Sequence, residues 1–139
     1  SPKDIKKIIA AKKKYSDKVI CGFSEINKNE SPFNRNIPKV VLNKFNDLVY
    51  ISRAAVPSTK KYNEKIKYLK QVCIYAFSKK ELKKFYSLKK KGKIKDLKEI
   101  EILRFFDLGV KIKMIKLSKN TIAVDEKKDI YKVEKILKK

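Results

Sequence analysis

The apolar run Gln71 to Phe77 (QVCIYAF) constrains the fold more than any other segment of this chain. A strand that is apolar on both faces is typical of the middle of a sheet that is covered on both sides. Ser78 and Glu81 follow at the S-x-x-E spacing of a capping box, in which two side chains bind free backbone N–H groups at a helix start. A buried strand that runs directly into a helix predicts a sheet flanked by helices.

The rest of the chain alternates between helix and strand patterns. Ser1 and Pro2 predict a helix start, and Ile5, Ile8 and Ile9 predict the apolar face of a helix that runs to about residue 14. Further strands are predicted at 19–26, 39–43, 48–52, 111–117 and 121–124, with helices after residue 78, at 96–108 and at 127–137. We expect strand 19–26 to be half buried, and we expect Gly109 to end the helix at 96–108.

The helix that follows Ser78 is expected to bury an apolar face made of Leu82, Phe85 and Tyr86. The two strands around the turn at 44–47 predict a β-hairpin arm, at about 39–57. The order of the elements predicts one α/β domain over residues 1–139, a mixed sheet flanked by helices.

The net charge of +23 suggests a polyanion as partner, but the basic residues argue against specific nucleic-acid recognition. Only three of the 38 basic residues are arginines, and the lysines are spread along the whole chain. Proteins that recognise nucleic acid specifically favour arginine, whose planar guanidinium makes two parallel hydrogen bonds to a guanine edge or a phosphate. We therefore expect no specific nucleic-acid partner, and a basic RNA-binding domain stays an alternative.

The chain has no histidine, so neither a zinc site nor a cysteine–histidine nucleophile is expected. Cys21 and Cys73 both lie in apolar runs and are interpreted as buried free thiols. No stretch reaches the roughly 18 apolar residues that span a bilayer, and no leader pattern opens the sequence. These patterns favour a cytoplasmic protein without a membrane partner.

Three local patterns suggest a binding site. Arg53 directly follows a strand and precedes Pro57, which could aim a fixed cation at an anionic ligand; a surface arginine is the plainer interpretation. Gln71 and Tyr75 are four apart on one strand and should share a face, with Cys73 between them. They could line a sugar pocket, or they could belong to a core in which the tyrosine hydroxyl is satisfied.

Asp125 is the third pattern, at the end of a predicted strand and before a predicted helix. Ligands of α/β sheets gather at the carboxyl ends of strands, and a carboxylate there could hold Mg²⁺ against phosphates. An N-cap of the last helix explains Asp125 equally well.

These patterns occur together, in order, in four segments: LVYISRAAVP, QVCIYAF, LKEIEILRFFDLGVKIKMI and IAVDEKKDI. Together the segments resemble the carboxy-terminal half of the CMP-Kdo synthetase (3-deoxy-manno-octulosonate cytidylyltransferase) family. The resemblance implies a nucleotide-diphospho-sugar-transferase-like fold and a homodimer joined by the hairpin arm. It implies a Mg²⁺-dependent reaction in which the anomeric hydroxyl of a sugar acid such as Kdo attacks the α-phosphate of CTP and releases pyrophosphate, for lipopolysaccharide or surface-glycan synthesis.

The resemblance also assigns residues. Asp125 matches the catalytic aspartate that binds the metal, and Tyr75 and Glu101 match residues that contact the sugar. Gln71 stands where the family commonly has histidine, so it cannot carry a positive charge, and Ile102 replaces a glutamine and cannot hydrogen-bond. Both departures leave the identity of the sugar acid open.

Two arginines, Arg53 and Arg104, match family arginines. Arg53 is expected to help bind the substrate, and Arg104 is given a supporting role.

The family's phosphate-binding loop, and its QGDEP-like motif with a second metal ligand, are not found in this sequence. In the family that motif comes just before a segment like SPKDI, which is residues 1–5 here. We therefore expect the nucleotide-binding part to be missing, the fragment to be inactive alone, and a sheet edge and apolar surface to be uncovered. A catalytically dead remnant that serves as a dimerisation or binding module is the other alternative.

Overall fold

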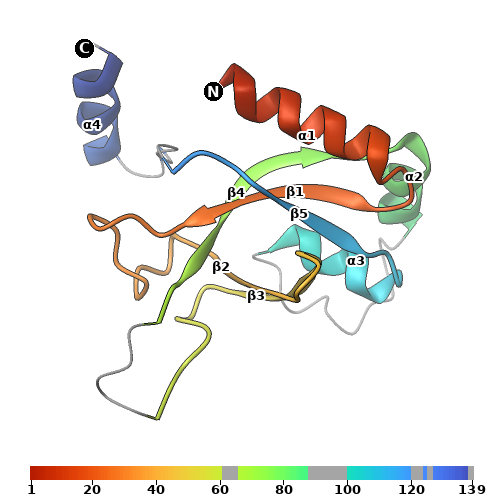
Figure 1. Ribbon diagram of the computed structural model, residues 1–139, viewed down its shortest axis with the longest axis horizontal. Coiled ribbons are helices and arrows are strands. Elements are labelled where there is room, and N and C mark those ends of the chain that lie inside the picture. Colours follow the sequence, from red (N-terminus) through yellow and green to blue (C-terminus); the bar gives the residue numbers. More distant parts are fainter. Residues whose placement is uncertain (61–65, 88–99, 120–123, 125–126, 138–139) are drawn as a thin grey trace.

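A computed structural model of the chain describes residues 1–60, 66–87, 100–119, 124 and 127–137. The described strands are β1 (Val19–Glu25), β2 (Lys39–Leu42), β3 (Leu48–Ser52), β4 (Leu69–Ala76) and β5 (Ile112–Lys116). The described helices are α1 (Pro2–Lys14), α2 (Lys79–Ser87), the 3-10 turn η2 (Glu101–Leu103), α3 (Arg104–Asp107) and α4 (Lys127–Leu137). The strands form one mixed sheet in the order β3-β2-β4-β1-β5, which confirms the predicted α/β class (Figure 1).

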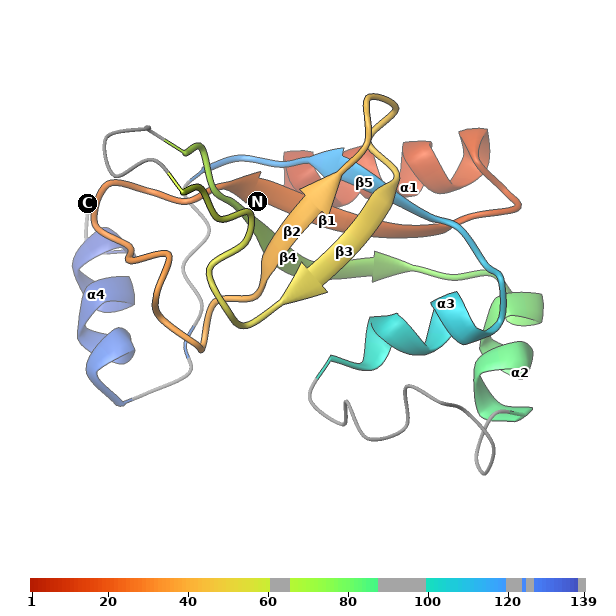
Figure 2. The same ribbon diagram turned by 90° about the horizontal axis from the view of Figure 1, so that it is seen from below.

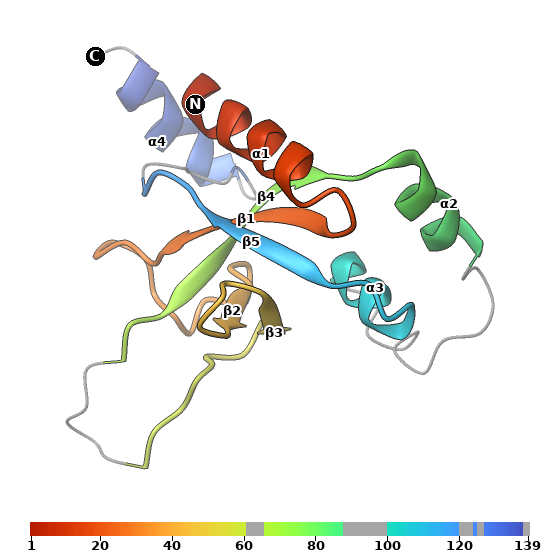
Figure 3. The ribbon, with the colours of Figure 1, turned by 45° about the vertical axis from the view of Figure 1, so that its right-hand side comes forward.

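Strand β1 is buried along most of its length. It pairs antiparallel with β4 and parallel with β5, and Val19, Ile20 and Cys21 have no exposed surface. The prediction of a half-buried strand is therefore wrong. Helix α1 covers one face of the sheet, while the hairpin and α3 cover the other (Figures 1 and 3). With both faces covered, the side chains of β1 do not alternate between core and solvent.

Helix α1 has the predicted bounds but buries only part of its predicted apolar face. The buried residues are Asp4, Ile8 and Ala11, whereas Ile5 and Ile9 are each 51 % exposed. The predicted apolar face is therefore right for Ile8 and wrong for Ile5 and Ile9, and a polar residue, Asp4, is buried instead, where it makes a hydrogen bond to Ser118.

Strands β2 and β3 form the predicted hairpin, which crosses the sheet on the face opposite α1 (Figures 2 and 3). At one end, Lys39 of β2 pairs with Lys70 of β4. At the other end the turn reaches β5, where the backbone N–H of Met114 donates to the carbonyl of Asn46 over 2.8 Å. Asp47 forms an isolated β-bridge with Lys113 of the same strand. The hairpin therefore ties together the two sides of the sheet and closes over the core between them.

The predicted turn at 44–47 is held by side chains of the hairpin itself. The side-chain oxygen of Asn43 accepts the backbone N–H groups of Phe45 and Asp47, each over 2.9 Å. Asn46 has φ of 58°, a left-handed conformation that asparagine tolerates better than most residues. Asp47 also binds Lys18 over 3.1 Å, which attaches the turn to the start of β1.

The helix predicted at 96–108 is shorter than expected. Ile100 has φ of −134°, so the chain is extended there and the helix begins at Glu101 as a 3-10 turn. Leu97 lies outside the described residues. Gly109 ends the helix as predicted, with φ of 62° and its N–H donating to Phe106 over 3.0 Å.

The exposed face of α2 corrects a further expectation. Leu82 and Tyr86 of α2 are 40 % and 63 % exposed, so only Phe85 of the predicted face packs against the core. Ile130 of α4 is 46 % exposed. The strand predicted at 121–124 falls largely outside the described residues. No described helix has the length and apolar character needed to cross a membrane.

One edge of β4 is open within the part of the chain that the structure describes. Strand β4 pairs with β1 from Leu69 to Ala76, but with β2 only at Lys70. From Val72 onward its other edge pairs with no described strand. The half-exposed Ile5 and Ile9 of α1, which packs over β1 and β4, add apolar surface to the molecule. This arrangement agrees with the expected uncovered sheet edge and apolar surface.

Gly22 of β1 is required by a close approach of its neighbours. A Cβ atom at this position would lie 2.4 Å from Cδ1 of Leu117 and 3.0 Å from the carbonyl oxygen of Val72.

We predict that Gly22→Ala lowers the free energy of unfolding by about 1–3 kcal/mol through overpacking, measured by urea denaturation. Gly109→Ala is the matched control, because no atom lies within 4 Å of its added methyl group and only its positive φ is strained. A stable Gly22→Ala variant with an unchanged urea midpoint would contradict the packing described here.

Asp4 joins the start of α1 to the end of β5. Its carboxylate accepts the hydroxyl of Ser118 over 2.5 Å and the backbone N–H of Ser118 over 3.1 Å. The hydrogen bond from the Ser118 hydroxyl is the main cause of the lowered pKa of Asp4. Two distant segments of the chain are thus held by one charged group.

We predict that Asp4→Asn lowers the free energy of unfolding at pH 7 by about 1–2 kcal/mol, because hydrogen bonds to a carboxylate are charge-assisted. Since the pKa of Asp4 is lower in the folded state, its stabilisation is complete above about pH 4 and is lost as the pH falls through the lowered pKa. Urea denaturation of both proteins at pH 7 and pH 3 should show the difference shrinking in acid. A difference that grows in acid would contradict this assignment.

Candidate functional site

The residues predicted to contact a ligand gather around an irregularity in β4. Cys21 of β1 is paired with Tyr75, but the next residue, Gly22, is paired with Val72. Strand β4 therefore has two additional residues, Cys73 and Ile74, at this point. Such bulges occur often beside active sites, where they redirect side chains.

Gln71 and Tyr75 share a face of β4, as their spacing predicts. The side-chain nitrogen of Gln71 donates to the Tyr75 hydroxyl over 2.9 Å and to the sulfur of Cys21 over 3.7 Å. Gln71 is 8 % exposed and Tyr75 is half-buried. The tyrosine oxygen accepts the amide hydrogen, and the Tyr75 side chain also makes a hydrogen bond with the side chain of Cys73.

The surroundings of Tyr75 favour its neutral form. Burial is the main cause that raises the pKa of Tyr75 well above its usual value, and the neighbouring thiols of Cys21 and Cys73 and the charge of Glu101 add to the effect. Glu101 is the exposed first residue of η2. The structure thus brings Gln71 and Tyr75 into direct contact, with Glu101 close enough to act electrostatically on the phenol.

The two cysteines differ, although both were expected to be buried. Cys21 has no exposed surface, and burial raises its pKa to about 12. Cys73 is exposed, so the prediction is wrong for this residue. The reason is the bulge, which sequence periodicity does not reveal and which turns Cys73 out of the core.

Arg53 lies where β3 ends, and its guanidinium is held by the loop that precedes β2. Its Nη1 donates to the carbonyl of Arg35 over 2.9 Å, and its own carbonyl accepts the ammonium of Lys39. The backbone N–H of Gln71 donates to the carbonyl of Pro38 over 2.9 Å. Arg53 and Gln71 therefore lie on either side of the first residues of β2.

A chain of aromatic rings supports Tyr75 from within the core. The ring of Phe77 stacks on Tyr75 at 5.7 Å and on Phe105 of α3 at 5.5 Å, measured between centroids. Phe85 of α2 lies 5.1 Å from Phe105, and the guanidinium of Arg104 lies 4.2 Å from the centroid of Phe85. Arg104 thus packs on an aromatic face, and its supporting role stays a prediction.

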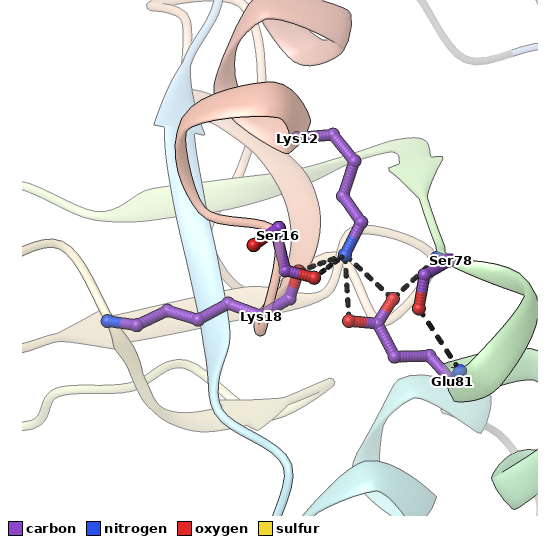
Figure 4. A network of polar contacts seen from close by, with 5 residues as sticks. All are labelled: Lys12, Ser16, Lys18, Ser78 and Glu81. Carbon is purple, nitrogen blue, oxygen red and sulfur yellow. Dashed lines mark hydrogen bonds and ion pairs between the residues drawn. The ribbon is translucent and has the colours of Figure 1, made fainter.

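A second polar network fixes the end of β4 (Figure 4). The ammonium of Lys12 donates to both carboxylate oxygens of Glu81 over 2.7 and 2.8 Å, and to the carbonyls of Ser16 and Lys18. Glu81 accepts the N–H of Ser78 over 2.6 Å, and its own N–H donates to the Ser78 hydroxyl over 3.2 Å, which confirms the predicted capping box. The network attaches the end of α1 to the start of α2 and so places the residues just before α2.

We predict an energetic coupling between Lys12 and Glu81 of roughly 1–3 kcal/mol in a double-mutant cycle with Lys12→Met and Glu81→Gln. The pair is strong because both side chains are largely buried, 17 % and 7 % exposed. The measurement is urea denaturation of the two single variants and the double variant. Lys116 and Glu25 form an ion pair whose side chains are 59 % and 30 % exposed, and serve as the control, for which little coupling is expected. Equal coupling in the two pairs would argue against the network.

The proposed metal ligand, Asp125, lies outside the described residues. Among the residues that the structure describes, no three carboxylate, histidine or cysteine side chains come together as a metal site. The described residues therefore do not by themselves fit a magnesium ion, and Asp125 stays a prediction.

Two lysines that no sequence pattern pointed to join separate segments of the fold. Lys12 forms the network with Glu81, and Lys39 is completely buried at the start of β2. Neither stands out in a chain with so many lysines. The S-x-x-E pattern indicated the polar helix start that Lys12 binds, but no comparable signal pointed to Lys39.

Comparison with known proteins gives a consistent result. The family model described as cytidylyltransferase matches residues 1–132. A 3-deoxy-manno-octulosonate cytidylyltransferase of Flavobacterium johnsoniae is 30 % identical over 114 residues, covering 82 % of this chain and 46 % of the relative. An 8-amino-3,8-dideoxy-manno-octulosonate cytidylyltransferase of Shewanella baltica is 32 % identical over 116 residues, covering 84 % of this chain and 46 % of the relative.

The fold is also that of a solved structure. A CMP:2-keto-3-deoxy-manno-octonic acid synthetase in complex with CTP matches with a TM-score of 0.82 and 25 % identity, over 99 % of this chain and 56 % of that chain. The present chain thus spans about half the length of the proteins that it matches.

Proposed function

Because this chain belongs to the cytidylyltransferase family, we propose that it forms the sugar-acid side of an enzyme that transfers CMP from CTP to a Kdo-like sugar acid and releases pyrophosphate. The observation that carries this proposal is the hydrogen-bonded pair of Gln71 and Tyr75, with Glu101 nearby, at the bulge of β4. We also propose that this reaction takes place in the cytoplasm and serves lipopolysaccharide or surface-glycan synthesis.

The pair of Gln71 and Tyr75 suits recognition of sugar hydroxyl groups. The tyrosine oxygen can accept from a hydroxyl through its second lone pair, the amide oxygen of Gln71 can accept from another, and so can the carboxylate of Glu101. Gln71 and Tyr75 are neutral over the physiological pH range, and burial moves the pKa of the phenol further above that range. This part of the site therefore recognises shape and hydrogen bonding more than charge.

The charged part of the sugar acid is assigned to Arg53. Its guanidinium is tied to the loop before β2 and is fixed before any ligand arrives. A held guanidinium loses less conformational entropy on binding a carboxylate than a free one does. Gln71, Glu101 and Arg53 thus divide the hydroxyls and the carboxylate of the sugar among them.

Catalysis requires more groups than these. Phosphoryl transfer depends on several positioned charges acting together, and the described residues hold neither a phosphate loop nor a metal site. We propose that this chain acts with a nucleotide-binding portion like the one that its relatives contain outside the matched region. The open edge of β4 supports this, because an unpaired strand edge is a template for a further strand.

A chimera tests the proposal. Joining this chain to the amino-terminal part of the Flavobacterium johnsoniae relative, up to its matched region, should give pyrophosphate release that needs CTP, a sugar acid and Mg²⁺. This chain alone should release none, because the phosphates would not be held. The release is measured with a coupled pyrophosphate assay, using Kdo and 8-amino-3,8-dideoxy-manno-octulosonate as substrates. A folded chimera that binds CTP but turns over neither sugar acid would contradict the assignment of the sugar side.

The same chimera tests Asp125 as a metal ligand. When bound, Mg²⁺ would offset charge on the phosphates and help to activate the hydroxyl. Asp125→Ala should lower kcat by at least about 100-fold, in the range of a lost electrostatic group, and should weaken the dependence on Mg²⁺. Asp17→Ala, which removes an exposed carboxylate in the turn before β1, is the control. Near-normal activity of Asp125→Ala would exclude the metal role.

We also propose that the chain forms a homodimer through the hairpin arm. Phe45, Val49 and Tyr50 of the arm are 60 %, 55 % and 48 % exposed, and large exposed apolar side chains gathered on one element are typical of an interface. Sedimentation of the purified chain should give the mass of a dimer. Val49→Lys and Tyr50→Lys together should give a monomer, whereas Leu82→Lys, in an exposed apolar position on α2, should leave the dimer intact.

A further inference from the structure

Lys39 is buried in a way that a lysine rarely is. It has no exposed surface, and it is the first residue of β2, in the middle of the junction of β3, β2 and β4. Lysines usually bury their alkyl stem and keep the ammonium in water. Burying an ammonium is costly unless it is hydrogen-bonded, so its partners should reveal its role.

The partners of the Lys39 ammonium are two backbone carbonyls from separate segments. One is the carbonyl of Asn34, at 3.0 Å, in the loop before β2. The other is the carbonyl of Arg53, just after β3. Lys39 thus connects the loop to the residue that carries the candidate cation.

The guanidinium of Arg53 returns to the same loop. Its Nη1 donates to the carbonyl of Arg35, the residue that follows Asn34. The backbone and the side chain of Arg53 are therefore tied to adjacent residues of one loop, the first through Lys39 and the second directly. The adjacent Pro38 accepts the N–H of Gln71, which links this junction to β4.

The geometry points to Lys39 as a positioning residue that fixes Arg53 beside the start of β2 and Gln71. Burial is the main cause that lowers the pKa of Lys39, and the nearby positive charge of Arg53 is the second cause. The two cations are therefore close enough to repel each other. At a buried position, an apolar side chain of similar size often stabilises the fold at least as much as a charged one. A residue needed only to fill this space would therefore not need a charge. The description of Arg53 as a sugar-acid residue rests on the proposed function, whereas the positioning itself does not.

The three arginines of this chain make the test direct. In a sample labelled with ¹⁵N-arginine, the side-chain Nε–H region of the NMR spectrum should contain only Arg35, Arg53 and Arg104, each assigned by an Arg→Lys variant. In the wild type, Arg53 should exchange its Nε hydrogen more slowly than the exposed Arg35, because the Nε atom of Arg53 is buried. Equal exchange of Arg53 and Arg35 in the wild type would overturn the proposal without any variant.

Lys39→Met should release Arg53 while the sheet stays folded. The exchange of its Nε hydrogen should become at least about tenfold faster, as expected for a group freed from local structure, while Arg104 stays unchanged. Lys70→Met is the matched control, because Lys70 is the cross-strand partner of Lys39 but its ammonium binds Glu30. Unchanged exchange of Arg53 in Lys39→Met, or equal acceleration in Lys70→Met, would overturn the proposal.

A separate measurement distinguishes this inference from the proposed function. In the chimera, Lys39→Met should raise KM for the sugar acid severalfold and leave KM for CTP unchanged. If Arg53 is released but KM for the sugar acid does not change, the positioning by Lys39 holds and the sugar role of Arg53 is wrong.

Discussion

Strand β1 lies between two partners of opposite direction, and its burial on both faces is the constraint on which the other elements depend. The antiparallel partner, β4, brings the candidate ligand residues, and the parallel partner, β5, closes the other side. Since no side chain of its central part can reach solvent, each face needs its own cover. Helix α1 supplies one cover, and the hairpin together with α3 supplies the other (Figure 3). Gly22 allows β1 to come this close to its neighbours.

The candidate site is built from this arrangement in two steps. The bulge of β4 opposite Cys21 lets Gln71 and Tyr75 meet on the core side, where aromatic rings hold the phenol. Two lysines then fix the surroundings: the half-buried Lys12 fixes the start of α2, and the buried Lys39 fixes the exit of β3. Each ammonium joins segments that are distant along the chain or belong to different elements.

Local patterns predicted the elements well, because their signals are short in range. The capping box of Ser78 and Glu81, the turn at 44–47 and the stop at Gly109 each depend on a few neighbouring residues, and each is present. Predictions that depend on distant partners were less successful. The burial of Asp4 is set by Ser118, far along the chain, and the exposure of Cys73 is set by a mismatch with β1.

The site was predicted only in part for the same reason. Spacing along one strand indicated that Gln71 and Tyr75 share a face, since a strand repeats every two residues. No spacing rule relates Arg53 to the loop before β2 or reveals that Lys39 joins them. Asp125 lies outside the described residues, so its place relative to Tyr75 stays a prediction.

The pairing of β1 with β5 has a consequence for how the chain is made. The residues joined by Asp4 and Ser118 are 114 positions apart, and the parallel pairing spans nearly as much of the chain. At the usual rate of about 5–20 residues per second, a ribosome delivers β5 on the order of 5–20 s after β1. Over this interval the nascent polypeptide carries an incompletely paired apolar strand, whose open edge is a template on which a strand of another chain could pair.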